Sequence, residues 1–171
     1  MKRQYKRVIL ILVRLLTIIG LILFYNKEKT FYKKSIERKS LRMEKFWSYF
    51  SVLDRWLKLK ENNQKLDKCL KDLGYERVAV YGLGKLGEHL IAELENSQVK
   101  VICGIDQNIN KGLGDIVTFC VGDKLPDIDV VIVTPVHDFY EIRDKLKAYV
   151  KCDIISLDEI VLRSELMKGL K

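Results

Sequence analysis

The chain has 171 residues, enough for one domain of ordinary size with an appendage and too few for two full-sized enzymatic domains. Its 31 Lys and Arg outnumber its 23 Asp and Glu, but the excess is not evenly spread. Residues 1–45 hold 13 basic and 3 acidic residues, which leaves 18 basic and 20 acidic residues for the remainder. A nearly neutral remainder argues against nucleic acid as a partner, because neutralising phosphates requires a basic face.

The four cysteines are Cys69, Cys103, Cys120 and Cys152, and none forms a C-x-x-C pair. Only two histidines are present to complete a metal site, so we expect no zinc site. Cys103 and Cys120 lie in apolar runs, where a free thiol behaves as a small buried hydrophobe. Such thiols suit the reduced cytosol.

Residues Val8–Tyr25 form an apolar run that just reaches the length needed to cross a bilayer. Four basic residues precede the run and eight follow between Lys27 and Lys45, which favours a C-terminal side in the cytoplasm. Arg14 opposes the span, since an arginine near its middle costs about 2.5–3.5 kcal/mol on insertion scales. Two alternatives stay open: a helix lying in the membrane interface, and a protein that begins at Met43.

The sequence predicts three segments: the basic residues 1–42 with the membrane helix, a helical segment over 43–74, and a domain over 75–171. Residues 44–60 have a helical stripe that we expect to pack against the domain or a second copy. The stripe consists of Phe46, Phe50, Leu53 and Leu57, broadened by Trp47, Tyr49 and Trp56. A second helix is predicted from Lys65 to Leu73, with Gly74 ending it in the left-handed conformation.

A short apolar strand, Arg77–Tyr81, leads directly into a glycine turn and then into a helical pattern. The turn has the spacing G-x-G-x-x-G, formed by Gly82, Gly84 and Gly87 with Lys85 and Leu86 between them. In this context the first glycine permits the tight turn, the second lets a pyrophosphate approach the backbone, and the third lets helix and strand pack closely. Amide groups at the start of the helix would face the phosphates.

The next predicted strand, residues 99–105, ends at Asp106, 19 residues after Gly87. A nucleotide-binding unit carries its ribose-binding acid near this position, and a carboxylate there repels a 2′-phosphate, which favours NAD over NADP. The alternative is a solvated Asp106 that opens a turn.

Further strands are predicted over 116–121, 129–134 and 153–156, with helices over 138–150 and from Leu157. Alternating strands and helices with apolar strands predict an α/β fold with a parallel sheet covered on both faces. We expect a small Rossmann-type domain with strand order 3-2-1-4-5. The nucleotide would bind at the carboxyl ends of its first and fourth strands.

Residues 78–108, VAVYGLGKLGEHLIAELENSQVKVICGIDQN, resemble the nucleotide-binding domain of sugar-nucleotide epimerase or dehydratase-like proteins from bacterial surface-polysaccharide loci. They also resemble the N-terminal domain of sugar acyltransferases. The resemblance covers roughly residues 43–162 and implies that Gly82, Gly84, Gly87 and Asp106 contact the nucleotide. Because the acyltransferase relatives bind a UDP-sugar, the ligand stays open between NAD and a sugar nucleotide. Lys85 is a candidate phosphate contact or a solvated residue.

The segment that ends in Thr134 and Pro135, followed by His137, is similar to the fourth-strand end of glucose-fructose oxidoreductase-type dehydrogenases. There the backbone passes over the nicotinamide side, so Thr134 and Pro135 are candidate cofactor contacts. His137 is the candidate acid or base, with a role in satisfying the loop as the alternative. The Glu-Lys-Pro signature of those enzymes is absent. The Tyr-x-x-x-Lys pair of the predicted domain, Tyr81 and Lys85, lies within the turn itself.

These observations predict a nucleotide-binding module that serves surface-polysaccharide synthesis at the cytoplasmic face of the membrane and is not catalytic by itself. Candidate partners are a glycosyltransferase, a sugar-modifying enzyme, or a second copy docked through the 44–60 helix. The alternative is an NAD-dependent sugar-nucleotide oxidoreductase or epimerase that a partner or second copy completes.

Overall fold

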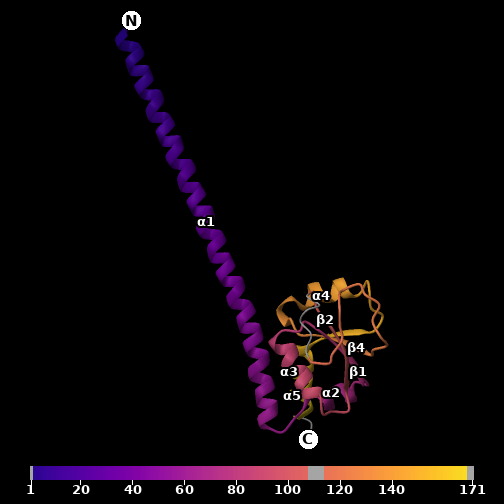
Figure 1. Cartoon of the computed structure of the whole chain (residues 1–171). Coiled ribbons are helices and arrows are strands. Elements are labelled where there is room, and N and C mark those ends of the chain that lie inside the picture. The colour runs from indigo at the N-terminus through magenta and orange to yellow at the C-terminus, as the bar shows by residue number, and fades with distance from the viewer. Residues whose placement is uncertain (1, 108–113, 169–171) are drawn as a thin grey trace. The chain divides into compact units, whose positions relative to one another are not determined.

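The computed structural model describes residues 2–107 and 114–168, and Figure 1 follows the chain from the long helix α1 to the C-terminus. The chain divides into two compact units, residues 1–46 and residues 47–171. Helix α1, Lys2–Glu61, provides all of the described structure of the first unit and the first element of the second.

Of the helices formed by the described residues, none combines the length and the apolar character that a membrane crossing requires. The side chains of residues 8–13 are not among those described. The predicted span over residues 8–25 lies partly outside the described residues and stays a prediction.

The second unit contains a sheet of five parallel strands in the order β3-β2-β1-β4-β5, which confirms the predicted topology. The strands are β1 Arg77–Tyr81, β2 Lys100–Ile105, β3 Thr118–Phe119, β4 Val130–Val133 and β5 Asp153–Ser156. Tyr81, the last residue of β1, pairs with Ile105 and Val133, the last residues of β2 and β4. The segments that follow these three strands therefore start at the same edge of the sheet. β3 is shorter than the predicted strand over 116–121, because only Gly104 and Ile105 pair with it.

Helices cover both faces of the sheet. They are α2 Leu66–Asp72, α3 Lys85–Leu94, α4 Phe139–Leu146 and α5 Leu157–Lys168, with the 3-10 helix η1 Val136–Asp138 before α4. One core joins strand side chains such as Val80 and Ile132 to buried residues of α1, α2, α3 and α5. The other joins the alternate strand positions, among them Val131, to Phe139 and Leu146 of α4. This division is that of a doubly wound sheet.

The face of α1 that packs against the rest of the second unit contains only one edge of the predicted stripe. Its buried side chains are Val52, Trp56 and Leu59, with Tyr49 partly buried beside them, so Trp56 and Tyr49, which were predicted to broaden the stripe, do pack. Phe50, Leu53 and Leu57 each follow a residue of the packed face by one position, about 100° around the helix, and are exposed together with Phe46. Their exposed fractions are Phe46 59%, Phe50 48%, Leu53 40% and Leu57 59%. Because both faces are apolar, periodicity alone did not identify the one that packs.

The carboxylate of Glu93 on α3 holds the end of α1 and the start of α2 in place. Its Oε2 accepts a hydrogen bond from Trp56 Nε1 at 2.5 Å and lies 2.9 Å from Lys60 Nζ. Its Oε1 accepts a hydrogen bond from the Leu66 backbone N–H at 2.8 Å. The Glu93 side chain is 2% exposed, so these donors satisfy a carboxylate that is removed from water.

We expect Glu93→Ala to lower the free energy of unfolding by about 2–4 kcal/mol, since each buried donor left without an acceptor costs about 1–3 kcal/mol. Denaturant unfolding followed by circular dichroism measures the change. Glu95→Ala is the control, because Glu95 lies on an exposed position at the end of the same helix. An equal loss in both variants would contradict the role of the Glu93 carboxylate.

Candidate functional site

The turn between β1 and α3 begins at Gly82, whose φ of +87° is a conformation that favours glycine. The Gly82 N–H donates to the carbonyl oxygen of Ile105 at 2.8 Å, which extends the pairing of β1 with β2 by one residue. A Cβ at Gly82 would lie 2.7 Å from Pro135 Cδ and 3.0 Å from Thr134 Oγ1. The residue after β1 is thus in van der Waals contact with the segment after β4.

Gly84 is the N-cap of α3, and no side chain of the described residues caps this helix start. A Cβ at Gly84 would have no heavy atom within 4 Å, so the backbone here borders open space. The first-turn N–H groups of a helix have no partner within the helix and carry the positive end of its dipole. Such an arrangement suits a phosphate group.

Lys85 and Leu86, which follow Gly84, have different surroundings. The Lys85 side chain is 85% exposed and its Nζ lies 2.7 Å from Glu88 Oε2. Leu86 is almost fully buried and belongs to the core. A phosphate contact by Lys85 would compete with its pairing to Glu88.

Gly87 lies against the strand, as its place in the motif predicts. A Cβ at this position would overlap with the carbonyl oxygen of Gly82 and lie 3.6 Å from Val80 Cγ1. The start of α3 can approach β1 this closely only because residue 87 has no side chain.

Asp106, directly after β2, is bound to the glycine turn. Its Oδ2 accepts a hydrogen bond from the Leu83 backbone N–H at 2.9 Å. The Leu83 side chain packs over Gly104, where a Cβ would lie 2.8 Å from Leu83 Cδ1. An ionised carboxylate has about four acceptor sites, so Asp106 can hold the turn and accept from a ribose hydroxyl.

Thr134 connects the end of β4 to the same turn and is buried. Its Oγ1 lies 2.7 Å from the carbonyl oxygen of Gly82 and 3.1 Å from that of Tyr81, and donates toward them. Pro135 packs against Gly82. Both residues therefore act on the turn through packing and hydrogen bonding, and the predicted cofactor contact stays a prediction.

His137 lies in η1, where its Nδ1 is 3.5 Å from Ser48 Oγ of α1. Farther along α1, Tyr49 and Leu53 line a cavity of about 250 Å³ together with the glycine turn and the β4 end. Its other lining residues are Gly82, Gly84, Lys85, Leu86, Thr134 and Pro135. Helix α1 thus forms one wall of the cavity at the point where the sheet reverses its winding.

Tyr81 and Lys85 do not behave as a catalytic couple. Burial raises the pKa of the Tyr81 phenol, while a hydrogen bond with Gln107 acts in the opposite direction. The phenol is therefore protonated near neutral pH, and Lys85 pairs with Glu88 instead.

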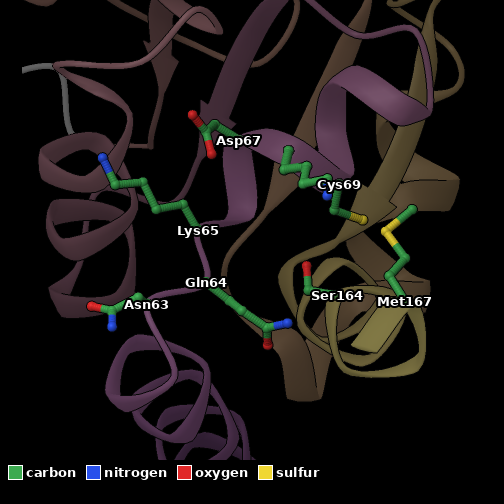
Figure 2. A pocket seen from close by; sticks show the side chains of 8 residues that line it. Asn63, Gln64, Lys65, Asp67, Cys69, Ser164 and Met167 are labelled. Atoms are coloured by element: carbon green, nitrogen blue, oxygen red, sulfur yellow. The ribbon is translucent and has the colours of Figure 1, made fainter. Parts of the chain in front are cut away.

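A separate cavity of about 470 Å³ lies between the α1–α2 loop, α2 and α5. Figure 2 shows Cys69 and Met167 pointing toward one another within it. Burial raises the pKa of the Cys69 thiol, which keeps it protonated and poorly nucleophilic. This cavity shares no lining residue with the one at the glycine turn.

The protein is thus an α/β protein with a Rossmann-type parallel sheet and an open glycine turn at its switch point. No protein-family model matches the chain, and it has no significant match among curated proteins or solved structures.

The structure brings together the glycine turn, Asp106, Thr134 and Pro135, and it adds four residues that the motifs do not single out. Ser48, Tyr49 and Leu53 of α1 face the site, and Leu83 donates its N–H to Asp106. Gly104 had a signal of its own, since a glycine inside a strand indicates close approach of another group.

We expect Gly87→Ala to lower the free energy of unfolding by about 1–2 kcal/mol. Overpacking against a backbone carbonyl costs about 1–3 kcal/mol, more than the roughly 1 kcal/mol that alanine gains over glycine within a helix. Gly84→Ala is the matched control and should change stability by about 0.5 kcal/mol or less: its Cβ meets no atom, and the N-cap preference for glycine over alanine is offset by the smaller freedom of alanine in the unfolded chain. Thermal and urea unfolding of both variants measure the difference, and a larger loss in Gly84→Ala would contradict this geometry.

Proposed function

We propose that the protein binds a nucleotide, either NAD or a sugar nucleotide, with its pyrophosphate over Gly84 and its ribose at Asp106. The single observation that carries this proposal is the uncapped start of α3 at Gly84, which borders open space beside a carboxylate on the neighbouring strand. Backbone amides at a helix start and a ribose-binding acid after the next strand are the two contacts that such sites use.

The conformation of the turn supports this proposal because it is determined before any ligand arrives. Gly82 is packed against Pro135, Gly87 against Gly82, and Leu83 is bound by Asp106. A preorganised site loses little conformational entropy when it binds its ligand.

We further propose that the module serves bacterial surface-polysaccharide synthesis at the cytoplasmic face of the membrane and is not catalytic by itself. The resemblance of residues 43–162 to proteins of such loci supports the process. The apolar run over residues 8–25 and its basic flanks support the location. A single candidate acid or base, His137, supports a binding role over catalysis.

The exposed side chains Phe50, Leu53 and Leu57 of α1 support a contact with another protein. Aromatic residues are enriched at such interfaces, and this face lies beside the one that packs on the sheet. A second copy, a glycosyltransferase or a sugar-modifying enzyme is the proposed partner.

Gly84→Val should abolish nucleotide binding and leave the fold intact, because a branched side chain would occupy the space above the turn without meeting a protein atom. Isothermal titration of the purified chain with NAD, UDP and UDP-glucose measures binding. Ala92→Val is the control, since it adds a similar volume at an exposed position of the same helix. Unchanged affinity for every nucleotide in Gly84→Val would contradict the assignment.

The full chain should sediment with membranes, and deletion of residues 8–25 should release it, because those residues supply the apolar run. Fractionation followed by carbonate extraction measures the association. Gly84→Val should remain in the membrane fraction and serves as a control for the second unit. Full recovery of the intact chain in the soluble fraction would refute the span.

A further inference from the structure

The ligand site over the glycine turn is bounded differently on its two sides. Toward β2 lies Asp106, which follows directly after that strand. Toward β4 lie Thr134 and Pro135, and α1 faces them with Tyr49 and Leu53 across a cavity of about 250 Å³. A dinucleotide on such a sheet places one nucleoside on each side of the glycine turn.

From this asymmetry we propose that α1 closes the β4 side, so that the site takes a nucleoside diphosphate rather than a dinucleotide. The inference rests on the proposed nucleotide-binding function and names its ligand class. The pyrophosphate would fill the part of the cavity beside Gly82, Gly84 and Lys85. Even the whole cavity is smaller than the roughly 300–1,000 Å³ that holds a drug-sized ligand, and a second nucleoside has to fit in what is left.

Helix α1 is a firm wall, because its second half shares the domain core and is bound to α3 and α5. Val52, Trp56 and Leu59 are buried in the core shared with β1 and β4. Arg55 binds α5 through Asp158 and Glu165, each at 2.9 Å. Moving α1 aside to admit a second nucleoside would break these contacts together with those that Trp56 makes with Glu93.

The lining of the cavity offers few hydrogen-bonding side chains to a nicotinamide. A carboxamide needs hydrogen-bonding partners when it is removed from water. Leu53, Leu86 and Pro135 offer none and the Thr134 hydroxyl already donates to the Gly82 carbonyl, which leaves the Tyr49 hydroxyl and the Lys85 ammonium group among the lining side chains.

The test compares NAD with ADP, because NAD contains ADP and adds only the second nucleoside with its phosphate linkage. Isothermal titration of the full-length chain with ADP, UDP and NAD should show binding of ADP or UDP, with NAD at least about tenfold weaker. Tyr49→Ala should then improve the affinity for NAD relative to ADP by about tenfold, since it removes part of the wall. Phe50→Ala is the control, because Phe50 is on the neighbouring, exposed face of α1 and should leave this ratio unchanged.

If Tyr49→Ala unfolds the protein, Leu53→Ala is the alternative variant, because Leu53 is a half-exposed residue of the same wall. NAD binding as tightly as ADP in the unmodified protein would overturn the inference and leave the proposed nucleotide binding intact. Failure of ADP, UDP and NAD alike to bind would overturn the proposed function and the inference with it.

Discussion

The carbonyl group of Gly82 is the point on which the rest of the site depends. Its oxygen lies 2.7 Å from the hydroxyl of Thr134, and Gly87 approaches it so closely that any side chain there would overlap with it. β1, β4 and α3 therefore meet at one peptide group. Because protein interiors are close-packed and transmit strain, a shift of this group would move the start of α3 and the β4 loop together.

Asp106 adds a second constraint from the neighbouring strand. By accepting the Leu83 N–H it joins the end of β2 to the turn after β1, and Leu83 in turn packs on Gly104. The carboxylate proposed to bind ribose therefore also sets the conformation of the turn proposed to bind phosphate. In a site of this kind the phosphate and ribose contacts are coupled, since a hydrogen-bonded network is disturbed as a unit.

Much of this fold could be predicted from sequence because its signals are local. β1 and β5 have the predicted boundaries, the strand order is the predicted one, and Gly74 has the expected positive φ of 85°. The orientation of α1 could not be predicted, because Phe50 and Val52 both belong to apolar stripes at helical spacing and tertiary packing decides between them. The same limit applies to Ser48 and Tyr49, whose positions beside the β4 end depend on that choice. The structural roles of Gly82 and Gly87 could be predicted, because the need for a residue without a side chain at these positions does not depend on which face of α1 packs.

Tyr49 and Leu53, which form the wall of the cavity, lie on the same helix, α1, as Trp56, which holds that helix in place. Leu53 precedes Trp56 by three residues and Tyr49 precedes it by seven, distances of about 4.5 and 10 Å along a helix. Trp56 is held by the Glu93 carboxylate, which also accepts the N–H of Leu66 at the start of α2. The position of Tyr49 over the glycine turn is therefore set by a buried carboxylate on α3, the helix that also begins at Gly84. One helix thus supplies the amides proposed to face the phosphate at its start and, two turns later, the anchor for the wall proposed to limit the size of the ligand.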